Sequence, residues 1–135
     1  MIKFLVSISL VFFSNICIAQ NFTFTGIPTV KISEAGIERN VEKIEKINSQ
    51  NLNCVIKEVD GKFYWETRGN KQLVRIDGLG AFVTFVAVDG SGYVRIVKPN
   101  LKEAVSLMSQ TERTFDYIEH LLLGLRTVTY YGKSM

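Results

Sequence analysis

Cysteine and histidine are scarce in this sequence, which has two cysteines and one histidine among its 135 residues. A zinc site needs three or four cysteine, histidine or carboxylate ligands at suitable spacing, and neither that pattern nor a calcium-binding loop is present. No glycine-rich fingerprint follows a strand and opens a helix, as a dinucleotide site requires. We therefore expect neither a metal nor an organic cofactor.

The scarcity of cysteine also excludes a disulfide framework. Cys17 lies in a predicted leader, which leaves Cys54 as the one cysteine of the mature chain. A single thiol cannot form an internal disulfide, and Cys54 is expected to be a small buried apolar residue. If Cys54 were exposed, it could link two chains.

A strong excess of one charge is also lacking, because 16 basic residues face 13 acidic ones. This balance argues against binding to nucleic acid or to an anionic membrane surface. The chain is 47% hydrophobic and 21% charged, which is typical of a folded domain rather than a disordered segment.

The first residues have the three parts of a secretory signal peptide. Lys3 supplies a positive charge, Phe4 to Phe13 is almost wholly apolar, and Cys17-Ile18-Ala19 offers small side chains before a cut after Ala19. A membrane anchor is the alternative, but this apolar run is too short for a hydrocarbon core of about 30 Å. We predict a cleaved signal over 1–19, a single domain over 20–135, and a secreted or periplasmic protein.

Two segments show helical spacing of apolar residues. Residues 33–48 have Ser33 as a candidate N-cap and a stripe formed by Ile37, Val41, Ile44 and Ile47. The second segment begins with a capping box, Ser109 followed by Glu112, and is expected to end near Gly124. Its apolar stripe comprises Phe115, Ile118, Leu121, Leu122 and Leu125.

The middle of the chain changes to the period of strands. Asp60-Gly61, Gly69-Asn70 and Gly90-Ser91 separate β-prone runs, and Asp-Gly is a strong hairpin signal. We expect five sequential antiparallel strands, with Thr127 to Tyr131 as a sixth strand or a packed tail. The predicted fold class is α+β: an antiparallel meander sheet of five to six strands, with an N-terminal and a C-terminal helix packed on one face.

Asp89-Gly90-Ser91-Gly92 is the stretch most like a phosphate-binding loop. Such a loop needs a helix N-terminus after it, because the helix amides supply much of the anion site. Here the β-prone run Tyr93 to Val97 follows. We therefore predict a hairpin turn, which pairs Val88 with Tyr93 and Phe85 with Ile96.

Two-residue turns assign the faces of the predicted sheet. Trp65 falls on a core face, where its indole N–H needs a partner. That face gathers Cys54, Ile56, Phe63, Trp65, Val74 and Ile76. The opposite face carries a row of Lys57, Tyr64 and Arg75, with Lys62 opposite Asp77. An ordinary solvated face explains these charges, but tyrosine and arginine are also enriched in binding hot spots. The candidate binding residues are Tyr64, Glu66, Arg68, Arg75, Tyr93 and Arg95.

No catalytic constellation stands out. His120 is predicted to be exposed beside Asp116, four residues earlier on a helix, without any nucleophile signature. We therefore predict a non-enzymatic binding module with a protein or envelope partner. One alternative is an exported hydrolase that uses Glu66, Asp77 or His120. Another is an assembly subunit, an oligomer that pairs through a sheet edge or the Thr127 to Tyr131 tail.

Overall fold

The computed structural model describes residues 21–39, 52–78, 80–98 and 115–135. Within these ranges the chain forms nine β-strands and one short 3-10 helix. In chain order they are β1 Thr23–Ser33, β2 Gly36–Glu38, β3 Cys54–Val59, β4 Lys62–Trp65, η1 Glu66–Arg68, β5 Lys71–Asp77, β6 Phe82–Ala87, β7 Gly92–Val97, β8 Tyr117–Leu123 and β9 Arg126–Ser134. In this part of the chain, no helix has the length and apolar character needed to cross a membrane.

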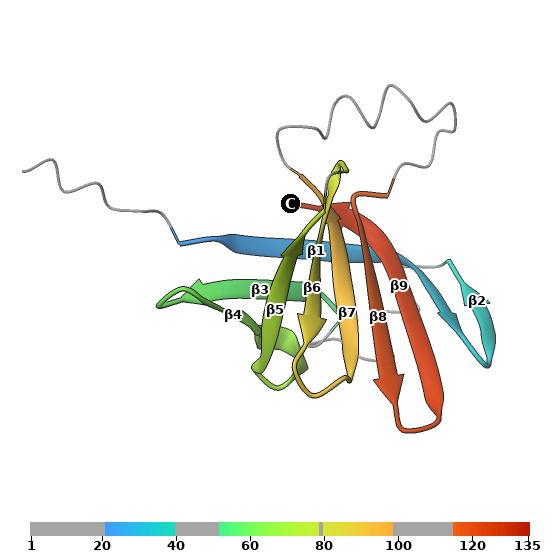
Figure 1. Cartoon of the computed structure of the whole chain (residues 1–135). Helices are drawn as coiled ribbons and strands as arrows, with labels where there is room; N and C mark the ends of the chain where they lie inside the picture. The colour runs from blue at the N-terminus through green and yellow to red at the C-terminus, as the bar shows by residue number, and fades with distance from the viewer. Residues whose placement is uncertain (1–20, 40–51, 79, 99–114) are drawn as a thin grey trace, which may run out of the picture.

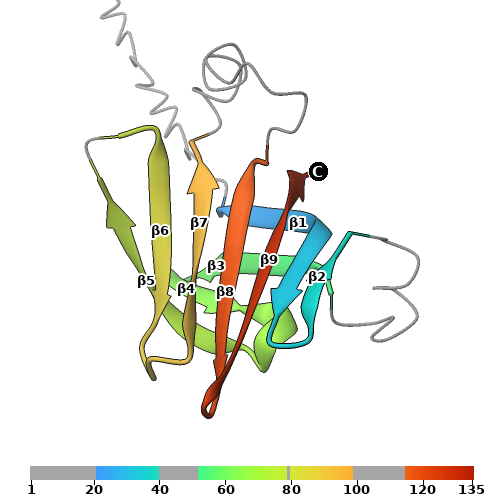
Figure 2. The ribbon, with the colours of Figure 1, turned by 90° about the vertical axis from the view of Figure 1, so that its right-hand side faces the viewer.

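The strands form one antiparallel sheet in the order β2-β1-β3-β4-β5-β6-β7-β8-β9, and β1 also pairs with β9 (Figure 1). This last pairing closes eight of the strands into a barrel. The long strand β1 makes the closure, because Thr23–Gly26 pairs with β3 and Gly26–Ser33 pairs with β9. The register of the second pairing shifts between Pro28 and Val30, and such an irregularity bends a strand. The short strand β2 extends β1 as a hairpin, as Figure 2 shows.

Side chains fill the barrel interior because inward and outward residues alternate along the strands. On β6, Val83, Phe85 and Ala87 are buried, and the residues between them are partly exposed. The largest fully buried side chains are those of Trp65, Tyr117 and Phe85. The interior is therefore a packed hydrophobic core in the described part of the chain.

The predicted α+β class is wrong, since the described residues are almost all β. At the predicted N-terminal helix, β1 continues to Ser33 and β2 begins at Gly36; residues 40–48 lie outside the described part. The Ser33 hydroxyl accepts a hydrogen bond from the Ala35 N–H, at 3.3 Å. A serine that binds a nearby backbone amide is common to N-caps and tight turns, so the capping signal here belongs to a turn.

The predicted C-terminal helix is wrong where the structure describes it, over 115–124. Tyr117 to Leu123 is strand β8, and residues 109–114 lie outside the described part. Tyr117, Glu119 and Leu121 are buried, as the two-residue period of a strand requires. Gly124, predicted to end a helix, lies in the turn between Leu123 and Arg126 and has a φ of 66°.

Several local predictions are confirmed. The Asp60-Gly61 hairpin pairs Ile56 with Trp65, and both turn residues have positive φ, at 51° and 75°. Asp89 to Ser91 turns between β6 and β7, so it is not followed by a helix. Its register differs by two residues from the prediction, because Phe85 pairs with Val94. The predicted strand at Thr127 to Tyr131 is part of β9, which lies between β8 and β1 and is paired on both sides from Val128 onward.

Candidate binding surface

The register between β4 and β5 decides which side chains reach the surface. A two-residue turn at Gly69-Asn70 would pair Phe63 with Ile76, but η1 lengthens this connection and Phe63 pairs with Leu73. The shift is an odd number of residues, so it exchanges the two faces of β5. Val74 and Ile76, predicted in the core, are each 51% exposed.

Arg75 lies on the inner face, opposite the buried Phe85. Its guanidinium lies over the rings of Phe22, Phe63 and Phe85, at 5.7, 5.8 and 6.0 Å from the ring centroids. The Arg75 Nε–H donates to both carboxylate oxygens of Asp77, at 3.1 Å each. Arg75 therefore covers one side of an inner-face aromatic cluster, while its own side chain stays 36% exposed. The predicted row of Lys57, Tyr64 and Arg75 is wrong in its third member, since Tyr64 pairs with Gln72.

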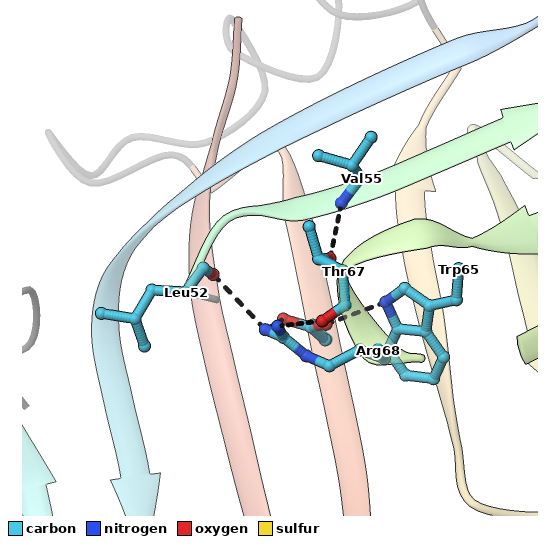
Figure 3. A network of polar contacts seen from close by, with 6 residues as sticks. Leu52, Val55, Trp65, Thr67 and Arg68 are labelled. Carbon is cyan, nitrogen blue, oxygen red and sulfur yellow. Dashed lines mark hydrogen bonds and ion pairs between the residues drawn. The ribbon is translucent and has the colours of Figure 1, made fainter. Parts of the chain in front are cut away.

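Arg68 also points away from the predicted surface, into the polar cluster of Figure 3. Its Nη2 donates to Oε2 of Glu119 at 2.9 Å and to the Leu52 carbonyl oxygen at 3.4 Å. The other carboxylate oxygen of Glu119 accepts a hydrogen bond of 3.0 Å from the Trp65 indole N–H. Glu119 is fully buried and the Arg68 side chain is 12% exposed. The hydrogen-bond partner that Trp65 was predicted to need is therefore Glu119. The sequence did not suggest this partner, because Glu119 was assigned to a helix rather than to a strand of the sheet.

Three further titratable side chains, those of Cys54, Tyr117 and Tyr130, lie in the core near Glu119. Burial raises the pKa of the Cys54 thiol well above its ordinary value, and the Glu119 charge raises it further. Burial also raises the pKa of the Tyr117 and Tyr130 hydroxyls. Cys54 is fully buried, so it cannot link two folded chains.

Glu119 makes stability depend on pH. Burial raises its pKa above the ordinary value of 4.5, although the Arg68 guanidinium opposes that shift. The folded state then binds the Glu119 proton more tightly than the unfolded state does. The stability that this proton adds is fully present below the unfolded pKa of Glu119, and it is lost as pH rises through the folded pKa. We expect the free energy of unfolding to decrease as pH rises above 4.5, and to decrease less in Glu119→Gln.

Chemical denaturation at a series of pH values measures this difference. Glu66→Gln is the control, because Glu66 is exposed and should leave the pH profile close to that of the wild type. Identical profiles for Glu119→Gln and the wild type would contradict the assignment.

The three residues proposed for a hydrolase have separate partners. Glu66 forms an ion pair with Lys57 at 2.7 Å, and Asp77 accepts from Arg75. His120 is half-buried rather than exposed, with Nδ1 2.8 Å from the Thr129 hydroxyl. Asp116 is not paired with His120 as predicted, because residues four apart along an extended segment do not lie side by side. Asp116 instead accepts from the Ser134 N–H at 3.0 Å. In the described ranges, no three histidine, cysteine, aspartate or glutamate side chains gather as a metal site would require.

The outer face of β5, β6 and β7 exposes several large apolar side chains. Val74 lies opposite Val86, and Val86 lies opposite Tyr93, so apolar residues run across three neighbouring strands (Figure 1). Tyr93 stacks on the His120 ring at a centroid distance of 5.3 Å. We call this surface the outer patch, and its members are Val74, Ile76, Phe82, Val86, Val88, Tyr93 and Arg95.

Two of the six predicted binding residues, Tyr93 and Arg95, lie on the outer patch. Arg95 is exposed, and its Nε–H donates to the Thr84 hydroxyl at 3.2 Å. Tyr64 pairs with Gln72 on β5, so it lies on the same face as Val74, on β4 beside the patch. Glu66 lies in η1 and is ion-paired with Lys57. Arg68 and Arg75 face inward. The apolar members Val74 and Ile76 were missed because the predicted turn placed them in the core.

Comparison of the chain with protein-family models, with curated proteins and with solved structures finds no match. A role for the outer patch is therefore inferred from the structure of this chain alone.

Proposed function

We propose that this protein is an exported, non-enzymatic binding module that recognises another protein through the outer patch. The observation that carries the proposal is the exposure of large apolar side chains on neighbouring strands whose other face already packs the core. Val74 and Ile76 are each 51% exposed, and Val88 is 63% exposed. Contiguous exposed apolar surface is typical of protein interaction sites.

The residue types of the outer patch also support a protein partner. Tyr93 supplies a rigid aromatic ring that is 37% exposed, and tyrosine and arginine are enriched where binding energy concentrates. The Thr84 hydroxyl holds Arg95 at Nε, and no carboxylate among the described residues pairs with its guanidinium. The partner is expected to present apolar side chains beside an acidic group.

Export supports an extracytoplasmic partner, and it rests on the signal-like pattern over 1–19. The hydrolase alternative lacks a shared site, since Glu66, Asp77 and His120 each have a different partner. The assembly alternative loses most of its proposed tail, since Val128 to Tyr131 is paired on both sides within the barrel.

A capture experiment tests the proposal, with the purified protein as bait for envelope and culture-supernatant fractions. The patch variant is Tyr93→Ala/Arg95→Ala, and the matched control is Tyr64→Ala/Glu66→Ala on β4 and η1. We expect the wild type and the control to capture the same partner, and the patch variant to bind it at least about ten-fold more weakly.

Circular dichroism and thermal unfolding establish that each bait is folded before capture. Equal capture by the patch variant, or no partner for any bait, would count against recognition through the outer patch. If only the Tyr64→Ala/Glu66→Ala control failed to capture the partner, the binding site would be at Tyr64 and Glu66 instead.

A further inference from the structure

A hollow of about 270 Å³ lies between two hairpins at one end of the barrel. The β1–β2 hairpin supplies one wall and the β8–β9 hairpin supplies the other, and Figure 2 shows both turns at the same end. The residues that line it include Lys31, Ser33, Leu123, Arg126, Thr127 and Val128. None of these six residues belongs to the outer patch.

The strand register shows that this hollow reaches the inner face of the barrel. Lys31 pairs with Tyr130, and Ser33 pairs with Val128. Tyr130 is part of the hydrophobic core and Val128 packs against it. Residues that pair directly across an antiparallel ladder share a face, so Lys31 and Ser33 also lie on the inner side. The hollow is therefore the open mouth above the packed core, which is where small barrels hold ligands.

The charges at this mouth favour an anion. Lys31 and Arg126 both line the hollow, and neither forms an ion pair with a carboxylate in the described part of the chain. Glu34 also lines it, so two positive side chains face one negative side chain. Arginine is well suited to a carboxylate because its guanidinium can donate two parallel hydrogen bonds.

The remaining wall is suited to an apolar group. Ala35, Leu123 and Val128 contribute aliphatic carbon beside the two cations. The volume is slightly below the usual range of about 300–1,000 Å³ for ligand pockets, which favours a small ligand. We propose that this mouth binds a small amphiphilic carboxylate, with Arg126 and Lys31 on the carboxylate and Leu123 and Val128 against a short alkyl chain.

Calorimetric titration of the purified protein tests this site with three probes. Octanoate carries both the carboxylate and the chain, octan-1-ol carries the chain without the charge, and acetate carries the charge without the chain. We expect saturable binding of octanoate, and binding of the other two that is weaker by about ten-fold or more.

Single substitutions test the assigned residues. Arg126→Gln and Lys31→Gln are each expected to weaken octanoate binding by about ten-fold, because a charge-assisted contact is lost. Lys133→Gln is the matched control, since Lys133 is exposed on β9 and does not line the hollow. The Tyr93→Ala/Arg95→Ala variant should bind octanoate like the wild type, which separates this site from the outer patch.

Three results would overturn the proposal. One is the absence of saturable octanoate binding to the folded wild type. Another is unchanged octanoate affinity in Arg126→Gln. The third is equal affinity for octan-1-ol and octanoate, which would show that the mouth does not select a carboxylate.

Discussion

Arg68→Met is expected to lower the free energy of unfolding at pH 7 by about 3–5 kcal/mol, because it leaves a buried carboxylate without its counter-ion. Glu119 is fully buried, and the Arg68 guanidinium lies 2.9 Å from its Oε2. No solvent can replace that contact without opening the barrel. Denaturant-induced unfolding, followed by the fluorescence of Trp65, measures the loss.

Two further variants separate the buried charge from the loss of side-chain packing. Arg68→Met/Glu119→Gln removes both charges but keeps an oxygen that can accept from the Trp65 N–H, so it should recover much of the stability. Lys57→Met breaks the exposed Lys57–Glu66 ion pair, whose side chains are 49% and 45% exposed. That control is expected to cost less than about 1 kcal/mol. If Arg68→Met and Lys57→Met lowered the free energy of unfolding equally, burial would not strengthen the Arg68–Glu119 pair.

The decrease in the free energy of unfolding caused by Arg68→Met should also become smaller in acid. Arg68 lowers the pKa of Glu119, so its removal lets the buried carboxyl take up a proton at a higher pH. A neutral carboxyl is much less costly to bury than a carboxylate. We therefore expect a smaller difference from the wild type at pH 4 than at pH 7.

Gly132→Ala is expected to cost about 3 kcal/mol or more, at the upper end of the range for overpacking. Gly132 lies where β9 meets both β1 and β8, opposite Pro28 and Tyr117. An added methyl group would overlap the Ile27 carbonyl oxygen and approach Cε1 of Tyr117 to 2.7 Å. The overlap is with backbone, so a side-chain rotation cannot relieve it. Strands β1 and β9 would have to separate where they close the barrel.

Gly80→Ala is the matched control, because a methyl group at Gly80 would have no atom within 4 Å among the described residues beyond its chain neighbours. Its effect on stability is expected to stay within about 0.5 kcal/mol, as for most surface substitutions. Thermal unfolding by circular dichroism compares the two variants. A Gly132→Ala protein with the stability of Gly80→Ala would mean that β1 and β9 do not approach this closely.

Turn chemistry made part of the sheet predictable. Asp60-Gly61 pairs Ile56 with Trp65 as expected, because Asp-Gly readily adopts the two positive φ angles of a tight hairpin. Gly69-Asn70 misled the prediction, because Glu66–Arg68 forms a 3-10 turn before it and moves the register. The Gly69-Asn70 dipeptide does not itself reveal that a 3-10 turn precedes it.

Only two of the six predicted binding residues lie on the outer patch, for the same reason. Tyr93 and Arg95 lie on the outer face as expected, since a register change of two residues leaves the faces unchanged. Arg68 and Arg75 lie on the inner face of the sheet, Arg75 with its side chain still 36% exposed, and Val74 and Ile76 lie on the outer face. Sequence alternation shows that neighbours face opposite ways, but it cannot say which of the two faces is buried.

Short-range pattern alone predicts the tight hairpin at Asp60-Gly61, the turn before β7 and a strand at Thr127 to Tyr131. The barrel itself depends on contacts between distant parts of the chain. Its closure pairs Gly26 with Ser134, and its buried charge pair joins Arg68 to Glu119. Within the few residues after Phe115, apolar spacing suits a helix or a strand almost equally well. Tertiary packing resolved that ambiguity, because only a strand at β8 can complete the hydrogen bonds of both β7 and β9 while placing Glu119 against Arg68 and Trp65.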